Sequence, residues 1–166
     1  MFKNIIKKNK GFTLIEILVV IGIIAILAAI VIIAINPARQ FAQARNTQRT
    51  ANVNAILNAI GQNTADYKGI FTCSGSTLDA TKRTICSTAG SGGCPLAASM
   101  TDLGCLVPTY IPALPVDPNG GNYQWTDSGN YNTGYTVQIE NNRTKVCAPH
   151  SVESALGNPT EICVIR

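Results

Sequence analysis

The chain has 166 residues and a formal net charge of +4, from 13 basic and 9 acidic side chains. Its length suits one soluble domain together with a membrane-spanning segment. Four of the basic residues are lysines within the first ten positions, so the rest of the chain carries nine charges of each sign. The net charge therefore gives no support for a nucleic-acid partner.

A long apolar run follows these lysines. Residues 12–35 contain a single charged side chain, Glu16, and as a helix they extend about 36 Å, enough to cross the ~30 Å hydrocarbon core of a bilayer. The run is apolar on every side, which is typical of a membrane span or a fully buried helix. Because a carboxylate in a membrane helix costs a few kcal/mol unless it has a partner, Glu16 is a candidate functional residue.

The start of this run forms a motif with the basic residues before it. It resembles the processing site of type IV prepilins and pseudopilins, and the matching residues are Gly11-Phe12-Thr13-Leu14-Ile15-Glu16. The resemblance implies that a prepilin peptidase and methyltransferase cleaves between Gly11 and Phe12 and N-methylates Phe12. Glu16 then matches the family's glutamate at the fifth mature position.

Cleavage after Gly11 would create an α-amino cation at Phe12, whose reference pKa is about 7.7–8.0. Glu16 is one helical turn from this amine in its own chain, and in a bundle it could equally meet the amine of a neighbouring subunit. Such a pair offsets part of the desolvation cost of both charges and aligns the subunits along the bundle.

The resemblance implies a structural subunit of a type IV pilus-like filament. Its partners would be the processing enzyme, further copies of the chain and other pilins. It would cross the cell membrane once, with the leader in the cytoplasm, and then enter an extracellular filament or an envelope pseudopilus. The alternatives are a pseudopilin of a type II secretion system and a membrane-anchored exported binding domain that never polymerises. A secretory signal peptide is the rival interpretation of the apolar run, but such signals have cores of only about 7–15 residues.

We expect an α+β fold, in which a long N-terminal helix packs its second half on a small antiparallel β-sheet with disulfide-tied loops. Pro37 should kink or briefly break the helix, because proline removes a hydrogen bond and clashes with the preceding turn; a loop that separates two helices is the alternative. The expected segments are a leader at 1–11, a transmembrane and filament-core helix at 12–35, an amphipathic half-helix at 36–69 and a globular head at 70–166, with a cysteine-rich loop at 70–121 and a sheet at 122–166.

The amphipathic half-helix carries an apolar stripe at helical spacing, which should pack on the sheet. Gly69 is a candidate terminator of this helix. Arg45 and Arg49 share one face, which we interpret as solvated, with a contact to lipid headgroups or an acidic neighbour as the alternative. The stripe consists of Val53, Ile56, Leu57 and Ile60.

The end of the chain shows strand patterns. Alternation is clearest from Tyr135 to Glu140, and Asn141-Asn142 suits a turn into the next strand. An antiparallel meander laid on the helix fits these segments, and it resembles the head of pilins. The other expected strands are residues 123–125, 145–147 and 162–165.

Six cysteines follow the apolar run, which indicates disulfides in an oxidising compartment. Six cysteines permit 15 connectivities. Local pairs, Cys73 with Cys86 and Cys94 with Cys105, would staple the long loop, and the resemblance to pilins implies a pair of Cys147 with Cys163. A metal site of Cys147 and His150 with Cys163 is a weaker alternative, and we expect no metal and no cofactor.

The remaining motifs are short. Asp117 and Asp127 suit turns and lack the dense oxygen ligands that calcium needs. His150 fits a surface position. Asn142-Arg143-Thr144 matches a glycosylation sequon. Nothing resembles a catalytic constellation, so we expect a protein that is not an enzyme.

Overall fold

The computed structural model describes residues 11–73, 75–87, 94, 99–157 and 159–166. The chain divides into two compact units, Met1–Gln40 and Phe41–Arg166. The expected leader, apart from Gly11, lies outside the described residues.

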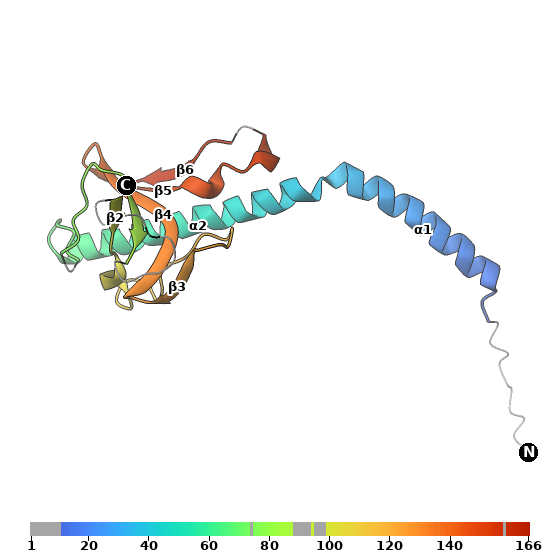
Figure 1. Cartoon of the computed structure of the whole chain (residues 1–166), viewed down its shortest axis with the longest axis horizontal. Coiled ribbons are helices and arrows are strands. Elements are labelled where there is room, and N and C mark those ends of the chain that lie inside the picture. Colours follow the sequence, from blue (N-terminus) through green and yellow to red (C-terminus); the bar gives the residue numbers. More distant parts are fainter. Residues whose placement is uncertain (1–10, 74, 88–93, 95–98, 158) are drawn as a thin grey trace, which may run out of the picture. The chain divides into compact units, whose positions relative to one another are not determined.

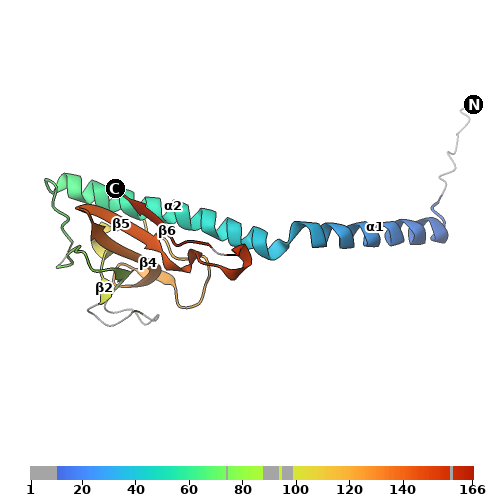
Figure 2. The ribbon, with the colours of Figure 1, turned by 90° about the horizontal axis from the view of Figure 1, so that it is seen from above.

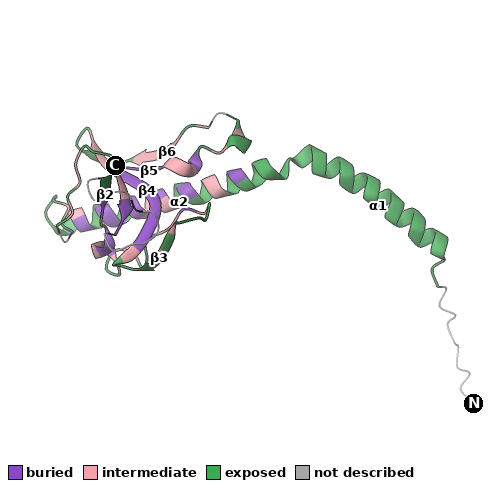
Figure 3. Ribbon diagram, viewed as in Figure 1, coloured by how far each residue is buried: buried purple, intermediate pink, exposed green. Residues whose placement is uncertain are grey.

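The first unit contains helix α1, Leu14–Ile35, which has no buried residue. Figure 3 shows it exposed along its whole length. By length and composition α1 could cross a membrane. Because its side chains are apolar on all faces and no described residue of its unit covers them, α1 suits an apolar environment.

A single residue, Asn36, separates α1 from helix α2, Pro37–Asp66. Asn36 has a left-handed backbone with φ of 46°, and its side chain accepts a hydrogen bond of 3.3 Å from the Arg39 amide. Asparagine is favoured at a helix N-cap, and proline at the first helical position. The expected kink at Pro37 is therefore an interruption, in which Asn36-Pro37 ends one helix and starts the next.

The second unit contains a mixed sheet (Figure 1). The strand order is β2-β1-β4-β5-β6, and β3 also pairs with β4. The pairs β3–β4, β4–β5 and β5–β6 form the expected antiparallel meander, whereas β1 and β2 are parallel. The strands are β1 Arg83–Cys86, β2 Met100–Thr101, β3 Gln124–Asp127, β4 Asn130–Glu140, β5 Arg143–Ala148 and β6 Ile162–Ile165.

The strands β1 and β2 correct the prediction of a structureless loop over 70–121. They are short, and β2 has only two residues, so neither shows a clear alternation in the sequence. β1 pairs with β4, where Thr84 lies opposite Thr136, and β2 pairs with β1. The sheet is consequently mixed and not purely antiparallel.

The core lies between α2 and the sheet. Figure 2 shows α2 extending along one side of the strands, and the predicted stripe of four apolar residues is buried. Gly69, with φ of 92°, donates to the Thr64 carbonyl at 2.8 Å just beyond the helix end, which is a terminating role that suits glycine. The stripe packs in one cluster with Ile85, Tyr135, Val137 and Val146.

All six cysteines are paired. Cys147 is joined to Cys163, on neighbouring strands β5 and β6, which is the pair that the resemblance implies. The two local pairs are wrong, because the structure joins Cys73 to Cys105 and Cys86 to Cys94. Parallel strands need a crossover connection, and Cys94 lies in the segment that connects β1 to β2. Cys86 is joined to a cysteine 8 positions away and Cys73 to one 32 positions away, so separation in sequence alone does not give the partners.

We predict that removal of the Cys147–Cys163 bond lowers the free energy of unfolding by about 3 kcal/mol, because the open loop gains conformational entropy when unfolded. Chemical denaturation of the detergent-solubilised Cys147→Ala/Cys163→Ala variant measures this loss. The single Cys147→Ser variant should lose a similar amount. Unfolding of the double variant at the wild-type denaturant concentration would contradict the prediction.

Candidate functional site

The expected processing site lies directly before α1. Gly11 and Phe12 are exposed and precede the helix, with 81% of Phe12 accessible. Thr13 is the N-cap of α1. An exposed, non-helical segment is a suitable protease substrate, because its backbone can be approached from several sides.

Glu16 lies in the first turn of α1, and its carboxylate turns back to Thr13. It accepts hydrogen bonds from the Thr13 amide and hydroxyl, both at 2.8 Å, while the Glu16 amide donates to the Thr13 hydroxyl at 3.2 Å. This reciprocal arrangement is a capping box, and it satisfies backbone donors that a helix start leaves unpaired.

Thr13 is a residue that our reading of the sequence overlooked. A threonine three positions before a glutamate, ahead of an apolar run, is the sequence signature of a capping box. The capping box gives Glu16 partners within its own chain and holds its carboxylate near the start of the helix, close in sequence to Phe12. Thr13 is therefore a positioning residue for Glu16.

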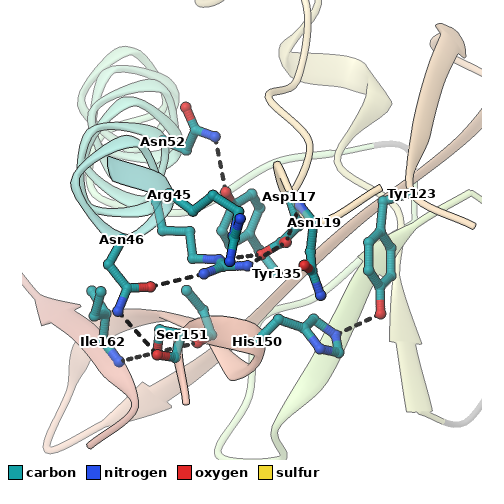
Figure 4. A network of polar contacts seen from close by, with 12 residues as sticks. Arg45, Asn46, Asn52, Asp117, Asn119, Tyr123, Tyr135, His150, Ser151 and Ile162 are labelled. Carbon is teal, nitrogen blue, oxygen red and sulfur yellow. Dashed lines mark hydrogen bonds and ion pairs between the residues drawn. The ribbon is translucent and has the colours of Figure 1, made fainter. Parts of the chain in front are cut away.

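A second polar site lies inside the head. It is a four-charge cluster of Arg45, Arg49, Asp117 and Glu153, contributed by α2, the segment before β3 and the loop between β5 and β6. Figure 4 shows this network, in which Arg45 and Asp117 are labelled. The cluster has two charges of each sign, so it is neutral as a whole.

Arg49 is the centre of this cluster and is fully buried. Its Nε and one terminal nitrogen donate to the two carboxylate oxygens of Asp117 at 2.8 and 2.9 Å. The other terminal nitrogen donates to Asn46 at 2.8 Å and to Glu153. Because a buried guanidinium is tolerated only when it is paired and hydrogen-bonded, these contacts are what allows Arg49 to lie in the core.

The prediction that Arg45 and Arg49 share a solvated face is therefore wrong for Arg49. Arg45 is partly exposed and donates to Glu153 from Nε at 2.9 Å. The acidic neighbours, given as the alternative, belong to the chain itself. They lie 68 and 104 positions from Arg49, so helical spacing alone could not reveal them.

Further hydrogen bonds tie the same segments to α2. Asn46 donates to the Ser151 carbonyl at 3.0 Å, and Asn52 donates to the Val116 carbonyl at 3.1 Å and the Tyr135 hydroxyl at 2.8 Å. Figure 4 shows Asn46 beside Ser151 and Asn52 above Tyr135. The first turns of α2 within the head therefore anchor both the segment before the sheet and the disulfide-closed loop.

Asp117 is positioned for its contact with Arg49 by the adjacent strand β4. Its amide donates to the Thr133 carbonyl at 2.9 Å. At Gly134, φ is 76°, and an added Cβ would lie 3.1 Å from the Cβ of Asp117 and 2.9 Å from the Tyr123 ring. Only glycine fits this close approach. Asp117 also accepts from the Asn119 amide at 2.9 Å, so the expected turn role is combined with the ion pair.

The charges shift the ionisation of their neighbours. Hydrogen bonds from Arg45 and then Arg49 lower the pKa of Glu153 to about 2, against the opposing effect of burial. Burial alone would lower the pKa of Arg49, but hydrogen bonds to Asp117 and Glu153 raise it above its ordinary value. Burial raises the pKa of Tyr135 to about 12. These shifts favour the charged forms of Glu153 and Arg49 at neutral pH.

Other candidates for chemistry have structural roles. Cys147, Cys163 and Glu161 lie close together, but both cysteines are in a disulfide and cannot act as thiolate ligands. His150 is partly buried, and its Nε2 lies 2.5 Å from the Tyr123 hydroxyl, as Figure 4 shows. Asp127 accepts from the Gly129 amide at 2.8 Å in a turn.

We predict that Arg49→Met lowers the free energy of unfolding of the head by about 3–5 kcal/mol, because Asp117 is then buried without its partner. The matched variant Arg45→Met, at a partly exposed ion pair, should cost about 1 kcal/mol or less. Denaturant titration of both variants measures the difference. Equal losses would contradict a central role for Arg49, and Arg49→Met/Asp117→Leu should recover most of the stability.

We also predict a pH dependence. Because the pKa of Glu153 is lowered from 4.5 to about 2 in the folded chain, its ionised form contributes stability that is complete above the unfolded value and is lost as the pH falls toward 2. Unfolding free energies measured between pH 6 and about 2 should fall less steeply in Glu153→Gln than in wild type. Glu140→Gln, at a partly exposed pair with Lys145, is the control and should change this slope less.

The comparison with known protein families identifies the amino-terminal segment. The family model described as the prokaryotic N-terminal methylation motif matches residues 6–34. No curated protein and no solved structure matches the chain. The matched range includes Gly11, Phe12, Thr13 and Glu16, together with most of α1. This chain therefore carries a prepilin-type cleavage and methylation signal within residues 6–34.

Proposed function

We propose that the chain is a structural subunit of a type IV pilus-like filament, cleaved after Gly11, N-methylated at Phe12 and assembled through α1. The observation that carries this proposal is α1 itself. It is a helix of 22 residues without a buried side chain, and most of it lies within the matched methylation motif.

The same apolar surface can serve in two surroundings. Before assembly α1 would be covered by lipid, since its length and composition suit a membrane span. After assembly it would be covered by the α1 helices of neighbouring copies. Transfer from lipid to a helix bundle leaves apolar side chains out of water throughout, so a single sequence meets both requirements.

Glu16 is the residue that would give this bundle its register. Within the described chain its carboxylate is bound only by Thr13. Removal of the leader creates a cation at Phe12, and an ammonium group is a stronger partner for a carboxylate than a hydroxyl. We assign to Glu16 the pairing with Phe12 of its own or a neighbouring subunit, with Thr13 holding the carboxylate at the helix start until the pair forms.

The head, from Phe41 onward, would lie outside the membrane. Its three disulfides fit an oxidising compartment. The partners would be the prepilin peptidase and methyltransferase, further copies of the chain and other pilins, and the role is structural and not catalytic. An extracellular pilus and the pseudopilus of a type II secretion system require the same chemistry of α1.

We predict that Glu16→Leu abolishes filaments while the protein is still inserted and cleaved. The substitution removes the charge that pairs subunits and makes α1 more apolar, so insertion should be retained. Electron microscopy of sheared surface or envelope material detects filaments, and mass spectrometry of the mature chain identifies its first residue. The control Thr13→Ser keeps the hydroxyl that binds Glu16 and should form filaments.

Two outcomes would contradict the proposal. A wild-type mature chain that retains Met1, or that begins after Ala44 as a secretory signal would leave it, excludes processing at Gly11. Normal filaments in Glu16→Leu would exclude charge pairing as the basis of assembly.

A further inference from the structure

The glycosylation sequon at Asn142 occupies an unusual position in this chain. Of the 15 asparagines, Asn142 alone is followed two residues later by serine or threonine with a residue other than proline between them. In Asn158-Pro159-Thr160 the middle residue is proline, which the sequon excludes. The chain therefore offers one site for asparagine-linked modification.

The structure places this sequon at the tip of the hairpin between β4 and β5. Glu140 pairs with Arg143, so the loop consists of Asn141 and Asn142, with φ of 52° and 60°. Both are exposed, as is Arg143, and Thr144 is partly exposed. Two-residue turns with two positive φ values project from the end of a hairpin, where an enzyme can reach the side chain.

The acceptor side chain of the sequon and its threonine are also free of side-chain hydrogen bonds among the described residues. Neither the amide of Asn142 nor the hydroxyl of Thr144 makes a side-chain hydrogen bond within the described part of the chain. The asparagines of α2 that lie in the head differ, because each makes a hydrogen bond through its side chain: Asn46, Asn52, Asn54, Asn58 and Asn63. The sequon is thus held open by the fold, whereas these other amides have structural roles.

Space for a sugar lies beside the hairpin tip. Asn142 and Thr144 line two adjacent hollows of about 520 and 460 Å³. The first also presents Asn58 and Gln62 of α2, and the second presents Ile70 and Phe71. Polar and apolar groups side by side suit the faces of a sugar ring, which carries both hydroxyls and C–H groups.

We infer that Asn142 is an N-glycosylation acceptor. The donor class is an oligosaccharide linked through a diphosphate to a membrane lipid. The amide nitrogen of Asn142 forms a bond to the anomeric carbon, the bond from that carbon to the diphosphate oxygen breaks, the amide loses one proton, and the lipid diphosphate leaves. This inference rests on the proposed function in one respect, because the head must reach the compartment where such donors are used.

The turn alone does not account for the sequon. Asparagine is favoured at positive φ, which explains Asn141 and Asn142 equally. It does not require a threonine at position 144. Glycine also suits both turn positions, so the acceptor can be removed without loss of the hairpin.

The test is mass spectrometry of the full-length protein isolated from the envelope of the organism that encodes it. Peptides that contain residue 142 should be heavier than their sequence by whole sugar residues in wild type. The matched pair Asn142→Gly and Asn141→Gly separates acceptor from turn, because both keep the hairpin and only the first should abolish the added mass. Thr144→Ala should abolish it as well, and Thr144→Ser should retain it.

A wild-type peptide wholly at its sequence mass would overturn the inference, as would sugar mass that persists in Asn142→Gly. The amino-terminal peptide of the same sample reports on the proposed function. N-methyl-Phe12 together with an unmodified Asn142 removes only the inference. A chain that retains Met1 contradicts the proposed function, and an unmodified Asn142 in that chain overturns the inference too.

Discussion

The exposure of α1 is the strongest physical constraint on this chain. A helix of 22 residues with no buried side chain cannot remain in water, because apolar burial is the main favourable term in folding and association. In the apolar surroundings that α1 requires, a carboxylate without a partner costs several kcal/mol. The two hydrogen bonds from Thr13 to Glu16 reduce that cost, so the capping box makes the single charge of α1 compatible with an apolar environment.

The head contains the opposite charge in a similar situation, a cation buried in the protein core. Arg49 has no solvent-exposed surface and depends on Asp117, Glu153 and Asn46 for its hydrogen bonds. A buried ion pair is not in itself strongly stabilising, but loss of one partner is costly. The pair therefore acts chiefly as a constraint on geometry. It requires the segment before β3 and the disulfide-closed loop to meet α2 at the level of Arg49.

The features that could be predicted from sequence are those that depend on a local pattern of neighbouring residues. Hydropathy and the Gly11–Glu16 motif located α1 and its signal, and period-two alternation located β4 and its neighbours. The burial of Arg49 could not be predicted, because its partners Asp117 and Glu153 lie far away in the chain. The partners of Cys73 and Cys86 could not be predicted either, because β1 and β2, which lie in the same segment, have too few residues to show a pattern. The capping box of Thr13 and Glu16 has a recognisable sequence signature and could have been predicted.

The two units have to meet different demands. The surroundings of α1 would change from lipid to protein during assembly, whereas the head has to keep one structure. All contacts of the four-charge cluster and all three disulfides lie within Phe41–Arg166, beyond the boundary at Gln40. None of these ion pairs and disulfides, all between described residues of the head, therefore depends on what covers α1. A subunit built in this way can exchange the partners of its N-terminal helix without refolding its head.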